Sequence, residues 1–284
     1  MPFPTVDSLD ALIADYDAIL CDVWGVLHNG VTAWPEAFGA LRRARRAGRQ
    51  VVLVTNAPRP HLPVRRQLAG LGVPEDAFDA VVTSGDVTRA LIAQAPRRLF
   101  HIGTERDLSI FEGLDVELAE EREASAFVCT GLYNDETETP DDYGDLLARL
   151  RGRDLSMICA NPDIVVDRGG KLIYCAGALA RLYQQLGGRT QIAGKPHRPI
   201  YDKALELAEQ ARGSAIDRSR VLAVGDGMTT DVKGAMDAGL DLLFVSDGIH
   251  AREYGAPGAP DPERLAAYLT DFGARPVATM TRLA

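Results

Sequence analysis

The stretch "AILCDVWGVLHNG", residues 18–30, decides the fold and supplies the first functional residue. Its apolar opening is as long as a buried strand and ends in one acidic residue, Asp22. An aromatic residue, Trp24, and a glycine, Gly25, follow almost at once. Ligands of open parallel sheets bind beyond the carboxyl ends of the strands, so Asp22 is the first candidate for chemistry.

Short apolar runs alternate with helical patterns along most of the chain. The run "VVLVT" (51–55) precedes a helical pattern over 60–71, and "AVVTS" (80–84) precedes another over 86–95. Near the end, "RVLAVGD" (220–226) is a further strand of the same kind. This alternation predicts an α/β protein with a Rossmann-like core, in which helices cover a parallel sheet.

Composition and charge argue against a protein that binds nucleic acid or spans a membrane. The 284 residues carry a formal net charge of −9, which is a poor match for a nucleic-acid backbone. No run approaches the roughly 18 apolar residues of a membrane helix, and the start "MPFPTVDSLD" lacks a signal-peptide pattern, so we expect a cytoplasmic protein. The cysteines form no CxxC pair and are expected to be buried thiols, with a zinc site or catalytic thiol as the alternative. They are Cys21, Cys129, Cys159 and Cys175.

The candidate site residues lie far apart in the sequence. They fall into four segments: 22–26, 55–56, 195–196 and 225–231. Between them, residues 85–187 have a strand–helix rhythm of their own. We therefore expect a core domain made of 1–84 and 188–284, with 85–187 as an inserted α/β cap domain.

The same segments carry polar groups at strand ends. Thr55 and Asn56 end one apolar run, Asp226 ends another, and Asp231 comes five residues later, while "QIAGKP" carries Lys195. If these strands are neighbours, carboxylates, a hydroxyl, an amide and an ammonium group share one crevice, which suits phosphoryl chemistry with magnesium. Taken singly, each has a plainer explanation as a turn residue, a helix cap or a surface charge.

The order of these pieces resembles the haloacid dehalogenase superfamily, and most of all its class IIA, NagD-like branch. The pieces are Asp22-Val23-Trp24-Gly25-Val26, Thr55-Asn56, Gly194-Lys195-Pro196, and Gly225-Asp226 with Asp231. "LGV" (71–73), "NPD" (161–163) and "AGALARL" (176–182) also read like that branch. The resemblance covers nearly the whole chain and implies a type C2 cap.

The resemblance implies a role for each matching residue. Asp22 would be the nucleophile that accepts a phosphoryl group as an aspartyl-phosphate. Magnesium would be held by Asp22, the backbone carbonyl of Trp24 and Asp226, with Asp231 close by.

The phosphoryl group would have partners of its own by the same resemblance. Thr55 would hydrogen-bond a phosphoryl oxygen, Gly25 and the Asn56 backbone would help to bind the group, and Lys195 would neutralise it.

Trp24 departs from the family pattern. Phosphatases of the superfamily usually carry at this position a second aspartate that protonates the leaving oxygen, a contribution of typically ~10²–10⁴ in rate. One reading is a phosphatase whose proton carrier lies elsewhere, such as His28 or the inserted domain. The others are an enzyme for acyl phosphates, a dehalogenase-like hydrolase, and a binding or regulatory protein without turnover.

The segment "NPDIVVDRGGKLIY" (161–174) corresponds by resemblance to the specificity loop of that branch. Its candidates for substrate contact are Asn161, Asp163, Arg168 and Lys171, and the alternative is a solvated hairpin of mixed charge. The expected substrate is a small phosphorylated metabolite, with no nucleic-acid or membrane partner. A homodimer formed through the cap follows by analogy alone.

Overall fold

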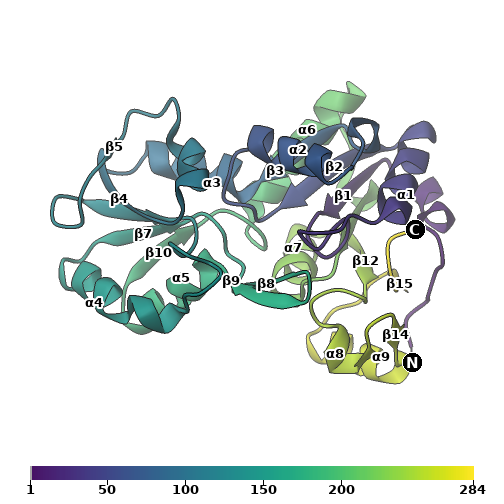
Figure 1. Cartoon of the computed structure of the whole chain (residues 1–284). Coiled ribbons are helices and arrows are strands. Elements are labelled where there is room, and N and C mark those ends of the chain that lie inside the picture. The colour runs from purple at the N-terminus through teal and green to yellow at the C-terminus, as the bar shows by residue number, and fades with distance from the viewer. Residues whose placement is uncertain (1) are drawn as a thin grey trace. The chain divides into compact units, whose positions relative to one another are not determined.

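The computed structural model describes residues 2–284, and it divides the chain into two compact units (Figure 1). The first comprises residues 2–55, Arg65–Val82 and Pro196–Ala284. The second comprises Asn56–Val64 and Thr83–Lys195, and is longer than the expected insertion of 85–187.

Local pairing explains both extensions of the second unit. The strand Arg189–Ile192 pairs in parallel with Ser156–Cys159, so this part of the chain belongs to the second sheet. At the other end, the Gly85 amide donates to the carbonyl of Ala57, and Asp86 accepts a hydrogen bond from the amide of His61. These bonds attach the segment Asn56–Val64 to the first turn of the helix Ser84–Ala93.

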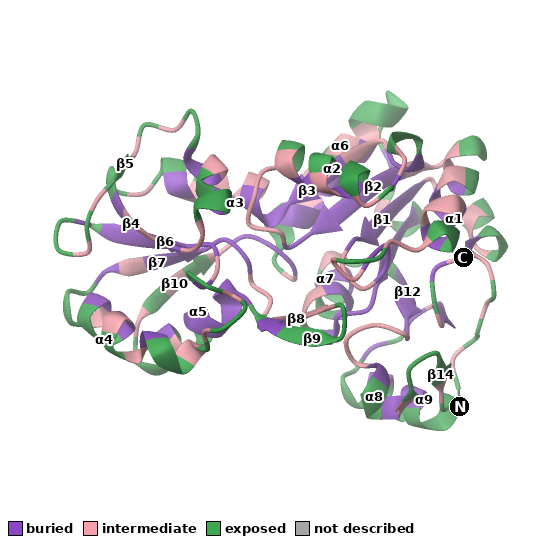
Figure 2. Ribbon diagram, in the orientation of Figure 1, coloured by how far each residue is buried: buried purple, intermediate pink, exposed green. Residues whose placement is uncertain are grey.

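The sheet of the first unit has the strand order β15-β12-β11-β1-β2-β3, with parallel pairing from β15 to β2. Its strands are β1 (Ala18–Asp22), β2 (Gln50–Thr55), β3 (Ala80–Thr83), β11 (Val221–Gly225), β12 (Asp241–Val245) and β15 (Ala278–Met280). β1 and β11 are buried along their whole length, as expected for strands of a parallel sheet that is covered on both faces. Figure 2 shows β1 in the purple of buried residues. The chain continues from β1 to β2 on one side while β11 lies on the other, so β1 sits at the switch point of the sheet.

The first unit also contains six helices within the described residues. They are α1 (Pro35–Arg46), α2 (His61–Gly70, whose first turn belongs to the second unit), α6 (Arg198–Arg212), α7 (Lys233–Ala238), α8 (Ala251–Tyr254) and α9 (Pro262–Asp271). Short 3₁₀ turns occupy Leu9–Ala11, Ile13–Asp15, Glu75–Ala77 and Arg218–Arg220, and β13 (Gly255–Ala256) pairs with β14 (Ala259–Pro260). α1 begins at a proline, and its buried residues Ala37, Ala40, Leu41 and Ala44 recur at helical spacing.

The second unit has a sheet of its own, in the order β10-β7-β6-β4-β5 and parallel throughout. Its strands are β4 (Arg98–Ile102), β5 (Glu117–Leu118), β6 (Ala126–Cys129), β7 (Ser156–Cys159) and β10 (Arg189–Ile192), with β8 (Val165–Arg168) and β9 (Lys171–Tyr174) as an antiparallel hairpin. Its helices are α3 (Ser84–Ala93), α4 (Gly144–Gly152) and α5 (Ala176–Gln185), with 3₁₀ turns at Glu105–Phe111 and Pro140–Tyr143. The fold is therefore the predicted α/β class.

Strand β6 shows why this second sheet is buried on both faces. Phe127 belongs to an apolar cluster with Leu147 of α4 and Leu179 of α5. Its neighbour Val128 belongs to a separate cluster with Ile92 of α3. Successive side chains of a strand point to opposite faces, so each face of the sheet carries its own core.

The cysteines are buried, and none of them forms a disulfide. Burial raises the pKa of the Cys159 thiol to about 12, and it also raises that of Cys129 and Cys175. Thiols in this state are inert, which agrees with the expected structural role. Within residues 2–284, no helix combines the length and the apolar character that crossing a membrane requires.

Candidate active site

Two adjacent parallel strands deliver the first two acidic residues to the same edge of the sheet. Asp22 is the last residue of β1, and Asp226 directly follows β11. The register pairs Cys21 with Val224, so the two carboxylates leave the sheet at nearly the same height. Both side chains are buried, with 6% and 4% of the residue exposed.

Asp231 comes from a widened helical turn, Met228–Val232, that precedes α7. Its Oδ2 accepts a hydrogen bond of 3.1 Å from the backbone amide of Gly227. A Cβ added to Gly225 would lie 2.4 Å from the Cγ of Asp231, so only a glycine lets this carboxylate fold back over the end of β11. Such wide turns occur often at functional sites.

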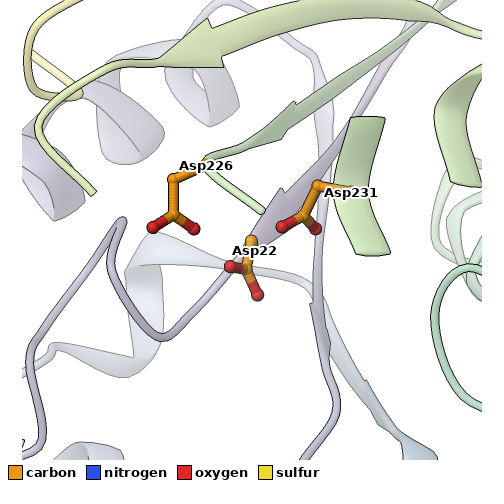
Figure 3. Close-up of side chains that lie close together, drawn as sticks. All are labelled: Asp22, Asp226 and Asp231. Atoms are coloured by element: carbon orange, nitrogen blue, oxygen red, sulfur yellow. The ribbon is translucent and has the colours of Figure 1, made fainter. Parts of the chain in front are cut away.

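The three carboxylates form one cluster. One ligand oxygen from each of Asp22, Asp226 and Asp231 lies within 4.8 Å of the others, and Figure 3 shows the side chains converging from two strand ends and the helical turn. Buried negative charges at this spacing repel one another strongly unless a cation is present. Oxygen ligands of this kind suit a hard divalent cation such as Mg²⁺, so the residues fit the metal that the sequence predicted.

The carboxylate of Asp226 is enclosed by two glycines from different loops. A Cβ added to Gly25 would lie 2.4 Å from its Oδ2, and one added to Gly248 would lie 1.9 Å away. Gly25 also has a φ of +85°, which disfavours any other residue. The amide of Ile249 donates a hydrogen bond of 2.8 Å to the same Oδ2. Gly248 and Ile249 were not found from the sequence, because "SDGIH" reads there as an ordinary loop.

The loop that follows Asp22 is tightly turned and holds Trp24 against His28. The Gly25 amide donates to the carbonyl of His28 at 2.8 Å, and the two aromatic rings meet edge to face with centroids 5.1 Å apart. The Nδ1 of His28 accepts a hydrogen bond of 2.9 Å from the amide of Gly30. Burial lowers the pKa of His28 to about 4, so the ring is neutral at pH 7 and carries its proton on Nε2. In the structure, His28 thus makes an ordinary hydrogen bond within its loop.

Thr55 also reaches this edge of the sheet. It is the last residue of β2, one position beyond Val54, which pairs with Asp22. The side chain is buried. Thr55 therefore lies on the strand next to the predicted nucleophile, at the height expected for a residue that contacts the same ligand.

Asn56 and Lys195 meet in the second unit. The Lys195 amide donates to Asn56 Oδ1 at 2.8 Å, and Asn56 Nδ2 donates to the carbonyl of Lys195 at 3.3 Å. Asn56 Nδ2 also donates to Asp163 Oδ1 at 2.8 Å. Asn161 lies in the same turn, where its Oδ1 accepts a hydrogen bond from the Asp163 amide.

The remaining predicted substrate contacts, Arg168 and Lys171, are ion-paired on the β8–β9 hairpin. Arg168 forms two hydrogen bonds with Asp135, the shorter of 2.8 Å, and another of 2.8 Å with Glu136. Lys171 Nζ lies 3.1 Å from a carboxylate oxygen of Glu136. These bonds attach the hairpin to the loop at 135–136, whose acidic residues the sequence reading left unassigned.

Comparison with known proteins gives the family. A haloacid dehalogenase-like hydrolase model matches residues 19–117, and a HAD-hydrolase-like model matches residues 192–272. The crystal structure of a haloacid dehalogenase-like hydrolase from Brucella suis 1330 is 59% identical, covers 98% of this chain and 100% of its own, and has a TM-score of 0.90.

Two more distant proteins agree with this assignment. The 5'-nucleotidase YutF of Bacillus subtilis is 26% identical over 261 residues, which are 90% of this chain and 97% of YutF. NagD from E. coli K-12 is 20% identical, covers 94% of this chain and 96% of its own, and shares the fold with a TM-score of 0.66. The motifs, the fold and these matches agree: the chain belongs to the haloacid dehalogenase-like hydrolase family and has the NagD-like fold of its class IIA branch.

Proposed function

We propose that this protein is a Mg²⁺-dependent phosphohydrolase that acts on a small phosphorylated metabolite through an aspartyl-phosphate at Asp22. The observation that carries the proposal is the cluster of Asp22, Asp226 and Asp231 at the carboxyl edge of the parallel sheet. A hydrolase of this family whose relative YutF is named a 5'-nucleotidase is expected to use such a cluster on phosphate esters.

The proposed reaction has two displacements. A carboxylate oxygen of Asp22 forms a bond to phosphorus while the bond to the leaving oxygen breaks, and the leaving oxygen takes up a proton from solvent. Water then attacks the phosphorus of the aspartyl-phosphate, which releases inorganic phosphate and a proton and restores the carboxylate. Bound Mg²⁺ would supply the positive charge that lets an anionic nucleophile approach an anionic phosphoryl group.

Residues of this protein would bind the metal and the phosphoryl group. Asp22, Asp226, Asp231 and the Trp24 carbonyl would hold the metal. Thr55, Gly25 and the Asn56 backbone would bind phosphoryl oxygens, and Lys195 would neutralise charge on the phosphoryl group.

The second unit is proposed as the cap that selects the substrate. Its segment 161–174 holds the residues expected to face the substrate. Because Arg168 and Lys171 already pair with Asp135 and Glu136, their charges are largely compensated, and they would orient the hairpin rather than bind a second anionic group.

A specific observation favours a second candidate, a binding protein with little turnover. Trp24 carries no titratable group, and His28, which packs against it, is a neutral ring whose Nδ1 is already hydrogen-bonded. Loss of general acid–base help of typically ~10²–10⁴ in rate would leave ligand binding intact.

The test is a panel of phosphorylated metabolites and p-nitrophenyl phosphate, assayed for phosphate release with Mg²⁺ and with EDTA. We expect metal-dependent release that Asp22→Asn abolishes, while Asp115→Asn, a change at an exposed position, leaves it unchanged. Full activity of Asp22→Asn would refute the nucleophile. No turnover by the wild type, together with Mg²⁺-dependent binding of a metal-fluoride phosphate mimic, would favour the binding protein.

A further inference from the structure

The side chain of Asn56 holds the backbone of Lys195 at two points. Its Oδ1 accepts from the Lys195 amide at 2.8 Å, and its Nδ2 donates to the Lys195 carbonyl at 3.3 Å. The two residues are 139 positions apart, and only 2% and 3% of each is exposed. A two-point bond made in a buried setting fixes the position and direction of the lysine backbone, from which its side chain starts.

Close packing leaves this backbone little freedom. A Cβ added to Gly194 would lie 2.7 Å from Asn56 Oδ1 and 2.4 Å from Ser84 Oγ. Such distances are shorter than those of real Cβ contacts, so the chain can approach Asn56 only through a glycine. A glycine at position 194 therefore allows the Lys195 backbone to reach the Asn56 side chain.

Asp163 stabilises one orientation of the Asn56 amide. Its Oδ1 accepts a hydrogen bond of 2.8 Å from Asn56 Nδ2. If the amide turned over, its oxygen would face the oxygens of Asp163 and of the Lys195 carbonyl, and its NH₂ group would face the Lys195 amide, so all three hydrogen bonds would be lost. The carboxylate at 163 therefore stabilises the amide orientation that binds Lys195.

Asp163 is itself held in place. Its amide donates to Asn161 Oδ1 at 3.1 Å, and its carbonyl accepts from the Gly177 amide at 3.1 Å. A Cβ added to Gly177 would lie 2.2 Å from the carbonyl oxygen of Pro162, so the turn packs directly on the first residues of α5. The "NPD" turn is thus a rigid support rather than a mobile loop.

We propose that Asp163 and Asn56 are positioning residues for Lys195: the Asp163 carboxylate orients the Asn56 amide, which holds the lysine backbone in place. This inference rests on the proposed function, because it assumes that Lys195 acts on the phosphoryl group. It gives Asp163 a role different from the direct substrate contact expected from its sequence position. It also couples the "NPD" turn to Lys195 within the second unit.

The test compares Asp163→Ala with Asp163→Asn in the full chain with Mg²⁺. An asparagine at 163 loses the charge but can still accept the bond from Asn56 Nδ2, whereas alanine cannot. We measure kcat and KM on p-nitrophenyl phosphate and the inhibition constant of inorganic phosphate. A lost hydrogen bond to a charged group corresponds to roughly a 10- to 100-fold effect. We expect a fall of that size in kcat/KM and weaker phosphate inhibition for Asp163→Ala, activity within about threefold of wild type for Asp163→Asn, and no change for the exposed control Asp141→Ala.

A double-mutant cycle with Lys195→Ala separates positioning from general structural damage. If Asp163 acts through the lysine, Asp163→Ala has no further effect once the lysine side chain is gone. Multiplied effects in the double variant would overturn the inference, and so would equal losses in Asp163→Asn and Asp163→Ala. If Asp163→Ala does not fold, Asn56→Ser takes its place, because it breaks the two hydrogen bonds between the Asn56 side chain and the Lys195 backbone. It is then combined with Lys195→Ala in the same double-mutant cycle. Full activity of Lys195→Ala and Asp22→Asn would instead refute the proposed function itself.

Discussion

Substitution of Gly248 by alanine tests whether the loop at 248–249 positions a metal ligand. The added Cβ would lie 1.9 Å from Asp226 Oδ2, about 1.5 Å short of the 3.4 Å at which ordinary contact begins. The φ of Gly248 is not in the left-handed region, so alanine is not excluded by backbone conformation. The added Cβ would also lie 2.3 Å from the Cβ of Asp226, so rotation of the carboxylate alone cannot relieve the contact. Either Asp226 or the loop at 248–249 must shift, and we expect the 2.8 Å hydrogen bond from the Ile249 amide to Asp226 to be lost.

The expected size follows from that bond. A hydrogen bond to a charged group contributes about 1.5–3 kcal/mol, and each 1.4 kcal/mol is a factor of about ten in affinity. We expect Gly248→Ala to bind Mg²⁺ roughly 10- to 100-fold more weakly than the wild type in isothermal titration calorimetry. Phosphate release should then recover in part at higher Mg²⁺ concentration.

Gly39→Ala is the matched control. Gly39 lies in α1 of the same unit, and the nearest atom to an added Cβ is 3.8 Å away. This change should leave Mg²⁺ affinity unchanged and stabilise the helix by about 0.5–1 kcal/mol. If Gly248→Ala folds with wild-type thermal stability and binds Mg²⁺ as tightly as the wild type, the proposed role of this loop is refuted.

Three further predictions concern single residues. Trp24→Asp should raise turnover on alkyl phosphates by up to roughly 10²–10⁴-fold, because it restores a proton donor; unchanged kcat would contradict this. Burial lowers the pKa of His28 to about 4, so stability should fall by about 3 kcal/mol as the pH drops from 6.5 to 4, where the unfolded chain binds a proton that the folded protein excludes. Urea unfolding should show that His28→Asn lacks this loss, and equal pH slopes would refute it. Hydrogen bonds from Arg220 and Arg212 lower the pKa of Asp17 to about 2. Because solvent screens this surface cluster, urea unfolding should show that Asp17→Asn costs at most about 1 kcal/mol at pH 7 and progressively less as the pH falls from 4 to 2, and a cost independent of pH would contradict this.

Much of the first unit could be predicted from local patterns. An apolar run such as Ala18–Cys21 is buried whichever strand lies beside it, so strand and burial follow from the sequence. Parallel strands present their carboxyl ends at one edge, so Asp22, Thr55 and Asp226 were expected at the same edge of the sheet. The structure places them there.

The limits of the second unit were harder to predict, for a physical reason. Strand Arg189–Ile192 is short and mostly polar, and its membership of the second sheet depends on pairing with β7. Ion pairs were also hard to predict, because they too depend on contacts between distant segments. From the sequence, Arg168 could bind an anionic substrate, but in the structure its guanidinium group is paired with Asp135 and Glu136.

By itself, the sequence determined the α/β class, the family and the identity of the acidic residues at the strand ends, because these depend on local hydrophobic patterns and short motifs. Only the tertiary structure decided which residues meet: the side chain of Asn56 with Asp163 and with the backbone of Lys195, and the side chain of Asp226 with Gly248. Those contacts join segments more than twenty and up to 139 residues apart. Because such a contact depends on how whole elements pack, no pattern within one segment encodes it.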